Sequence, residues 1–388
     1  MPHFYAQELH LPPMPFEQEG FSFCYEAQSL RDSKVSLIRV KHHLSDFCLL
    51  KIEQQGRILC KGEKSTRPIP VGILQHALEI LSHYGKEIKG NLALSHCPSR
   101  AFLVAFNHFN FESFYLEIGF GSGRFLLQKA QANPKNLYIG LEVHTPSIEQ
   151  VLRQIELLGL KNLYIAHADA RTLLEVLPPN CERLDIHFPV PWPKHPNRRI
   201  FTPQTLENML SVLRSQGEIW LRTDSLEYFK DSLELALNLS TCQATIAKNA
   251  PQEGVVSKYE ARWVRQAKDI YDLRLKSATS SHRPKLPLLL PTTQNIKYKG
   301  VKASSLWQEK SKMGEDYFLN IQDVLEYKDL WLLAVSLGDV RSPLNKILSW
   351  DRKGGGLEYV GGAPFNTKAQ RHAHEALCAL LQQEVFGG

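Results

Sequence analysis

The stretch Leu116-Glu117-Ile118-Gly119-Phe120-Gly121-Ser122-Gly123 holds the strongest structural signal in the chain. An apolar run ends in an acidic residue, and three alternating glycines then lead into a helical pattern. Glycine lets the backbone turn sharply and approach a ligand without a Cβ in the way. The spacing differs from the Gly-x-Gly-x-x-Gly of dinucleotide-binding folds, because Arg124 stands where the last glycine would be. The stretch therefore predicts a strand, a ligand-binding turn and a helix.

Short apolar runs alternate with amphipathic stretches from Phe114 to about Lys276. This alternation predicts a parallel sheet covered by helices on both faces, with ligands bound beyond the carboxyl ends of the strands. The expected strands are Phe114–Ile118, Leu137–Val143, Leu163–Ala166, Leu184–Phe188 and Glu218–Arg222. The expected helices include Ser147–Leu158 and Thr205–Leu213.

The segments on either side have a different pattern, in which short β-branched runs precede a helix. On the N-terminal side the expected elements are strands over Val35–Val40, Phe47–Ile52 and Arg57–Cys60, and a helix from Pro70. Beyond a linker at Ser277–Thr293, they are strands over Tyr317–Ile321 and Leu330–Leu337, and a helix capped near Asn366 or Thr367. We therefore expect an α/β, Rossmann-like doubly wound domain at residues 111–280, flanked by smaller α+β domains at residues 1–110 and 294–388.

Composition narrows the class of protein. A formal net charge of +6 permits a nucleic-acid partner without requiring one. The seven cysteines include no Cys-x-x-Cys pair, so we expect reduced thiols and no metal site. The N-terminus lacks a signal-peptide pattern, and no apolar stretch approaches the length of a membrane span. We expect a cytoplasmic protein without a membrane partner; the oligomeric state is left open.

Carboxylates follow three successive expected strands. Glu117 precedes the first glycine, Glu142 ends the next strand, and Asp169 follows the third. Glu117 suits the ammonium of S-adenosylmethionine, Glu142 the two ribose hydroxyls, and Asp169 the adenine amino group. Each has a simpler interpretation, namely a turn without ligand, a solvated strand end and a helix cap. Taken together, the three carboxylates favour a nucleoside site for S-adenosylmethionine.

Further motifs carry a resemblance to a known family. They are Ile139–Pro146, the run Phe188-Pro189-Val190-Pro191-Trp192-Pro193-Lys194, Arg198-Arg199-Ile200, Thr223-Asp224 and Ser257-Lys258-Tyr259-Glu260. With Leu116–Gly121, they resemble the bacterial tRNA (guanine-N7)-methyltransferases over roughly Tyr115–Glu260. The resemblance implies methyl transfer from S-adenosylmethionine to N7 of a guanine in the variable loop of tRNA.

The resemblance also implies roles for individual residues. The implied cofactor-binding residues are Glu117, Gly119, Gly121, Glu142 and Asp169. The implied substrate-binding residues are Lys194, Asp224, Ser257, Lys258, Tyr259 and Glu260. Val190 stands where the family has an Asp, so no catalytic residue is assigned with certainty, and Asp224 and Glu260 are the candidates for the guanine edge. Because guanine N7 carries a free lone pair, we expect activity to survive without that carboxylate.

Cations surround these motifs and predict contacts with tRNA phosphates. They are Lys194, His195, Arg198 and Arg199, followed by Lys258, Arg262, Arg265, Lys268, Arg274 and Lys276. Trp192 fits either a base-stacking or a packing role, and His187 is expected to be a hydrogen-bonded structural residue. Two alternatives remain open: a methyltransferase of another RNA or of a small molecule, and a catalytically silent tRNA-binding module that lost the reaction with Val190.

Overall fold

The computed structural model describes residues 2–92, 97–241, 243–251, 268–276, 287–291, 293–308, 312–340 and 342–383. The chain divides into two compact units. We call Pro98–Leu288 the central unit. The outer unit combines Met1–Cys97 with Leu289–Gly388. Each unit is described by itself.

The central unit is built on one sheet with the strand order β12-β11-β10-β13-β14-β16-β15. Its strands are β10 (Phe114–Ile118), β11 (Tyr138–Glu142), β12 (Leu163–His167), β13 (Cys181–His187), β14 (Leu213–Thr223), β15 (Gln243–Lys248) and β16 (Tyr271–Lys276). The first five in this order pair in parallel, which confirms the predicted parallel core. The last two pair antiparallel and were not predicted, because neither has a continuous apolar run: β15 is almost wholly exposed, and β16 alternates charged and apolar residues.

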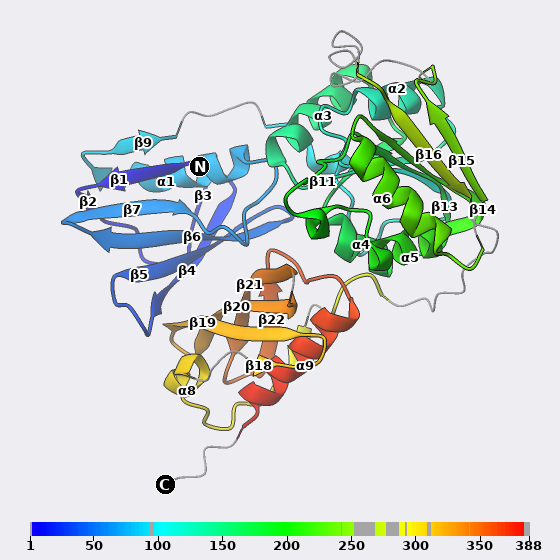
Figure 1. Cartoon of the computed structure of the whole chain (residues 1–388). Helices are drawn as coiled ribbons and strands as arrows, with labels where there is room; N and C mark the ends of the chain where they lie inside the picture. The colour runs from blue at the N-terminus through cyan, green and yellow to red at the C-terminus, as the bar shows by residue number, and fades with distance from the viewer. Residues whose placement is uncertain are drawn as a thin grey trace. The chain divides into compact units, whose positions relative to one another are not determined.

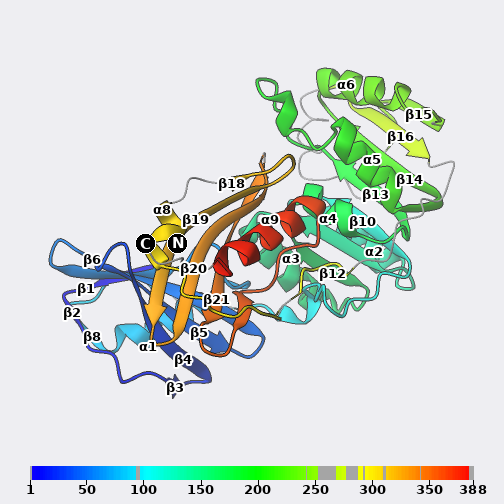
Figure 2. The same cartoon turned by 90° about the horizontal axis from the view of Figure 1, so that it is seen from below.

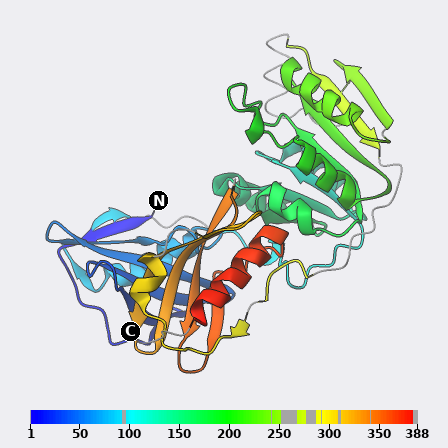
Figure 3. The ribbon, with the colours of Figure 1, turned by 60° about the horizontal axis from the view of Figure 1, so that its bottom comes forward.

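Helices cover both faces of this sheet (Figures 1 and 3). They are α2 (Arg124–Ala132), α3 (Thr145–Leu158), α4 (Ala170–Val176), α5 (Pro203–Val212) and α6 (Leu226–Leu237), with short 3-10 turns η1 (Arg100–Phe102) and η2 (Pro196–Arg198). Helices α2 and α3 pack together over β11 and β12, whereas α5 and α6 pack on β14. Strands β10 and β11 are therefore almost wholly buried, as expected for strands covered on both sides.

The outer unit contains a large antiparallel sheet, ordered β17-β22-β21-β20-β19-β4-β5-β6-β7-β1-β9, with β18 and β3 pairing beside this path. Its N-terminal elements are β1 (His3–Ala6), β2 (Glu8–Leu9), β3 (Phe16–Gln18), β4 (Phe21–Ser29), β5 (Val35–His42), β6 (Ser45–Gln54), β7 (Arg57–Gly62), α1 (Gly72–Ser82), β8 (Gly85–Lys86) and β9 (Lys89–Asn91). Its C-terminal elements are β17 (Thr293–Asn295), α8 (Ala303–Gln308), β18 (Lys312–Met313), β19 (Phe318–Tyr327), β20 (Leu330–Asp339), β21 (Ser342–Asp351), β22 (Gly356–Val360) and α9 (Lys368–Leu381).

The two outer segments share this sheet, which differs from the two separate flanking domains that the sequence predicts. Strand β4 pairs antiparallel with β19, so Ser29 lies opposite Leu325. Figure 2 shows the N-terminal strands in blue beside the C-terminal strands in orange. The buried Arg39 guanidinium also binds Asp46 at 2.7 Å and Glu358 at 2.6 Å, which ties β5 to β22. Pairing of two open sheet edges explains why one unit forms.

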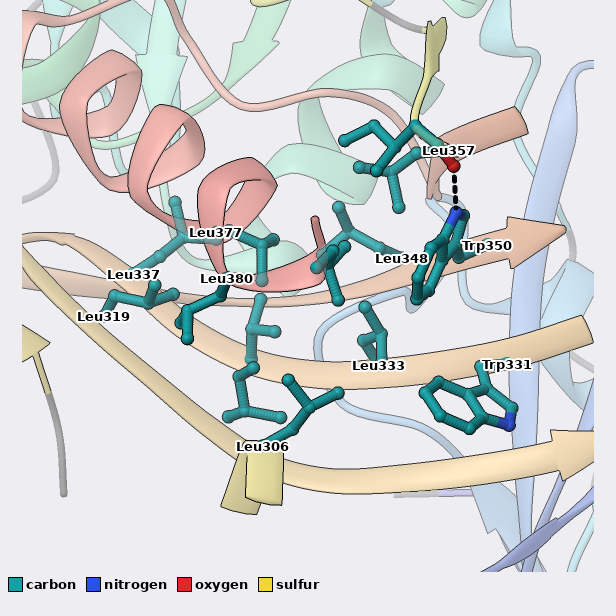
Figure 4. Packing of buried hydrophobic residues seen from close by; sticks show 14 of the residues in the cluster. Leu306, Leu319, Trp331, Leu333, Leu337, Leu348, Trp350, Leu357, Leu377 and Leu380 are labelled. Atoms are coloured by element: carbon teal, nitrogen blue, oxygen red, sulfur yellow. Dashed lines mark hydrogen bonds between the residues drawn. The ribbon is translucent and has the colours of Figure 1, made fainter. Parts of the chain in front are cut away.

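The C-terminal half of the outer unit has its own apolar core. Helix α9, capped by Thr367 as predicted, packs on β20 and β19 and buries Leu377 and Leu380 against this face of the sheet. Figure 4 shows these leucines beside Leu319 and Leu337 in one apolar cluster. The Trp350 indole in the same core donates to the Ile296 carbonyl at 3.0 Å. Among the described helices of either unit, none has the length and apolar character that a bilayer crossing requires.

Candidate functional site

The order of the parallel strands marks one place in the central unit for a ligand. From β10 the chain runs outward through β11 and β12, then returns to place β13 on the other side of β10. In open α/β sheets, such a reversal in strand order places the ligand-binding site beyond the carboxyl ends of the two strands that flank it, which here are β10 and β13. Glu117 and His187 lie at those ends.

The glycine loop between β10 and α2 is shaped for close approach. Gly119, Gly121 and Gly123 all have positive φ, at 71°, 53° and 66°. A Cβ on Gly119 or Gly121 would meet nothing within 4 Å, so space lies open beside both residues. A Cβ on Gly123 would instead lie 2.5 Å from Val151 of α3. The first two glycines thus leave room for a ligand, whereas the third serves packing.

Glu142 joins the second strand to this loop. Its Oε2 accepts a hydrogen bond from the Gly121 amide at 3.1 Å, and its Oε1 accepts from the Val143 and His144 amides at 2.8 and 3.0 Å. A carboxylate has about four acceptor positions, so at least one remains for a ligand hydroxyl. The structure therefore brings Glu142 to the glycine loop, as the sequence analysis expected.

Glu117 is buried beside other carboxylates. It lies opposite Asp185 in the register of β10 and β13, and its side chain is 6% exposed. Burial, and then the charges of Asp185 and Glu142, raise the pKa of Glu117 well above its ordinary value. Its Oε2 atom has no hydrogen-bond partner among the described residues. A cationic group placed here would relieve both the unpaired oxygen and the repulsion between carboxylates.

Asp169 lies just beyond β12, next to β11, so the three predicted carboxylates occupy the same edge of the sheet. Its side chain caps α4 by accepting from the Arg171 amide at 2.9 Å, and it also pairs with the Arg171 guanidinium at 2.7 Å. Within the chain, Asp169 therefore acts as the helix cap that the simpler interpretation describes. The carboxylate is still one-third exposed, and these bonds leave acceptor positions unused.

The segment after β13 holds the Pro-Trp-Pro motif in a strained conformation. Phe188 and Trp192 have φ values of 49° and 42°, which non-glycine residues rarely adopt and which cluster at functional sites. The Phe188 amide donates to the Arg222 carbonyl at 2.7 Å. Val190 is 61% exposed, so the position where the family has an Asp faces open space in the central unit.

Arg199 does not belong to the exposed cations. It is 2% exposed, pairs with Glu227 at 2.7 Å and with Asp231, and donates to the Pro191 carbonyl at 2.6 Å. Its predicted contact with tRNA phosphates is wrong, because its guanidinium already bonds to two carboxylates of α6 and to a carbonyl of the Pro-Trp-Pro segment. Lys194, His195 and Arg198 are exposed as expected.

Of the remaining residues predicted to contact the substrate or its phosphates, the structure describes some and not others. Asp224 follows β14 and pairs with Lys268 at 3.3 Å. Arg274 packs over Trp220 at 4.5 Å and pairs with Glu218 at 3.5 Å, so it is not a simple exposed cation, whereas Lys276 is exposed. Ser257, Lys258, Tyr259, Glu260, Arg262 and Arg265 lie outside the described residues.

A polar network beneath the site escaped the sequence analysis. Arg222 and Asp272 form a buried pair at 2.6 Å, and the Trp220 indole donates to the same carboxylate at 2.8 Å. These residues lie next to His187 and Asp185 on one face of the sheet. Their alternation with apolar neighbours in β14 and β16 was the available signal. In the described residues, no group of three or more His, Cys, Asp or Glu side chains could hold a metal ion.

The geometry defines the class: a methyltransferase-like α/β sheet with carboxylates at three adjacent strand ends. A family model described as a putative methyltransferase matches residues 112–273. The tRNA (guanine-N(7)-)-methyltransferase of Helicobacter hepaticus is 40% identical, covering 99% of this chain and 100% of that protein. Proteins of the same name from Wolinella succinogenes and Campylobacter jejuni are 38% and 30% identical, covering 97% and 98% of this chain and 99% of each relative. The chain therefore belongs to the tRNA (guanine-N7)-methyltransferase family, and the resemblance extends into the outer unit.

Proposed function

We propose that this protein transfers a methyl group from S-adenosylmethionine to N7 of a guanine in the variable loop of tRNA. One observation carries the proposal. Relatives named tRNA (guanine-N(7)-)-methyltransferase match the chain over nearly its whole length. The cluster of Glu117, Glu142 and Asp169 at adjacent strand ends supports it, because these groups suit the ammonium, the ribose hydroxyls and the adenine amino group of one ligand.

Bound S-adenosylmethionine would supply a methyl group already activated by its sulfonium. With the donor bound, its methyl carbon would accept the guanine N7 lone pair as the carbon–sulfur bond breaks, so positive charge would pass from sulfur to the purine ring. No proton has to be removed first, because N7 is an acceptor in the unmodified base. Alignment of the two reactants is therefore the main task of the protein, and positioning of this kind supplies about 7–11 kcal/mol.

Within this proposal the residues have separate tasks. Glu117 binds the donor's ammonium, Glu142 its ribose, and Asp169 its adenine. Lys194 and Asp224 hold the guanine nucleotide, together with Ser257, Lys258, Tyr259 and Glu260. Because Val190 carries no charge, Asp224 or Glu260 takes the guanine-edge role, and Asp224 pairs with Lys268 at 3.3 Å. A tRNA substrate also fits a cytoplasmic location.

The test uses purified full-length protein, S-adenosylmethionine and unmodified tRNA, followed by mass spectrometry of the nucleosides. We expect 7-methylguanosine from the wild type and a loss of activity of at least a hundredfold in Glu142→Gln, about the effect of two lost charge-assisted bonds. Glu207→Gln is the matched control, because Glu207 is an exposed carboxylate on α5 away from the strand ends. Binding of tRNA without any methylated product would favour a silent binding module instead.

A further inference from the structure

Two buried side chains with unpaired atoms lie close together on neighbouring strands. Glu117 is the penultimate residue of β10 and His187 is the last residue of β13, and these two strands flank the reversal in strand order. Their side chains are 6% and 7% exposed. Glu117 Oε2 and His187 Nε2 both lack a hydrogen-bond partner in the described parts of the chain. Buried polar atoms are nearly always paired, so two orphans in one place indicate a missing partner.

The two side chains lie close together but do not bond to each other. Glu117 Oε1 lies 4.0 Å from His187 Nδ1, which is too long for a direct hydrogen bond. The unpaired atoms are the other two, Oε2 and Nε2, so a ligand group with several N–H bonds beside this pair could donate to each of them separately. The imidazole is also held in orientation, because Phe125 and Trp220 pack edge-on against it at centroid distances of 4.4 and 4.6 Å.

The chemistry of the pair favours a cation with several N–H groups. Burial, together with Arg183, Arg222, Lys129 and Arg274, lowers the pKa of His187 to about 3, so its ring is neutral and keeps one lone pair. A neutral imidazole accepts a hydrogen bond through that lone pair. A carboxylate accepts through either oxygen. Two neighbouring acceptors match an ammonium group, whose three N–H bonds need separate partners.

We propose that His187 is a further donor-binding residue, which together with Glu117 holds the ammonium at the amino-acid end of S-adenosylmethionine. This inference rests on the proposed function, because it assigns one subsite of that donor. It replaces the expectation that His187 is a hydrogen-bonded structural residue, since its Nε2 has no partner in the described structure. His187 binds the donor directly, through a neutral ring held between Phe125 and Trp220.

The test compares ligands that differ only at the amino-acid end. Calorimetry would measure the Kd of S-adenosylhomocysteine, which carries the ammonium, and of 5′-methylthioadenosine, which lacks that end. We expect His187→Phe to raise the first Kd roughly tenfold to a hundredfold, the factor that follows from losing one hydrogen bond to a charged group. The Kd of 5′-methylthioadenosine should change less than about twofold, because the adenosine contacts are untouched. His195→Phe, an exposed histidine on the neighbouring segment, is the control.

Further ligands and variants decide between related outcomes. Decarboxylated S-adenosylmethionine keeps the ammonium and should weaken as S-adenosylhomocysteine does. If only ligands with the carboxylate weaken, or if methylthioadenosine weakens equally, the assignment is overturned. His187→Leu repeats the measurement in case the phenylalanine variant does not fold. Should the wild type bind no S-adenosylhomocysteine at all, the proposed function fails, and the inference fails with it.

Discussion

Replacing Arg199 with Met tests whether this residue is internal or a tRNA contact. The change leaves the Pro191 carbonyl without its donor, at about 1–3 kcal/mol, and removes a cation that packs 5.1 Å from the Tyr228 ring, at about 0.5–2 kcal/mol. Glu227 and Asp231 are 58% and 49% exposed, so freeing them adds only about 0–1 kcal/mol. We expect the central unit to lose about 2–5 kcal/mol of stability.

Thermal unfolding measures this loss through the transition that S-adenosylhomocysteine shifts, which reports the central unit. For a unit of this size, the loss lowers the Tm by roughly 5–15 °C. Arg198→Met is the matched control, because Arg198 is exposed and loses only its contact 5.2 Å from the Trp192 ring, so the free energy of unfolding should change by no more than about 1 kcal/mol. Because Arg199 anchors the Pro-Trp-Pro segment, Arg199→Met should also raise the KM for tRNA.

Salt dependence separates the two arginines further. If Arg198 contacts a phosphate, its loss lowers the slope of log K against log salt by about 0.7–0.9, whereas the loss of Arg199 leaves the slope unchanged. The reasoning is refuted if Arg199→Met keeps the wild-type Tm while reducing the salt slope. That result would make Arg199 a surface contact with tRNA.

Three more predictions follow from buried groups. A Cβ at position 140 would lie 2.4 Å from Leu126 Cδ2, so Gly140→Ala should destabilise the central unit by about 1–3 kcal/mol in thermal unfolding; Gly356→Ala, with open space, should not. Arg39→Met breaks the link between β5 and β22 and should cost the outer unit about 1–3 kcal/mol, because Asp46 and Glu358 are 27% and 41% exposed and stay solvated; an unchanged Tm would disprove this. The pKa of His187 falls from 6.5 to about 3 on folding, so the unfolded chain takes up a proton first as the pH drops. The free energy of unfolding should therefore decrease below pH 6.5, by about 2 kcal/mol at pH 5. In thermal melts at pH 7 and pH 5, His187→Phe should lack this part of the decrease.

The local features of the central sheet could be predicted from the sequence because they depend on neighbours along the chain. The strand at Phe114–Ile118 has the expected bounds, and the glycines after it adopt the positive φ that the turn requires. Each parallel strand is a short apolar run because both faces are buried. Glu117, Glu142 and Asp169 could be placed at one edge for the same reason, since parallel strands end on the same side of a sheet.

Features that depend on distant partners could not be predicted in this way. The sequence Arg198-Arg199 shows two similar cations, and only the packing of α6 separates a buried anchor from an exposed side chain. His187 is an unremarkable residue at a strand end until Glu117 is placed 4.0 Å away. The sequence predicts two small domains for the outer segments, because no local pattern indicates that the edge strand β4 will pair with the edge strand β19.

By itself, the sequence determined the strand–turn–helix around the glycines, the order of carboxylates at the strand ends and the family to which the protein belongs. These features depend only on short-range periodicity and on the spacing of motifs. The tertiary structure alone decided which charges are buried, which polar atoms lack partners and that residues 1–97 and 289–388 form one unit. The physical reason is that burial and electrostatic environment are set by groups brought together from far apart in the chain.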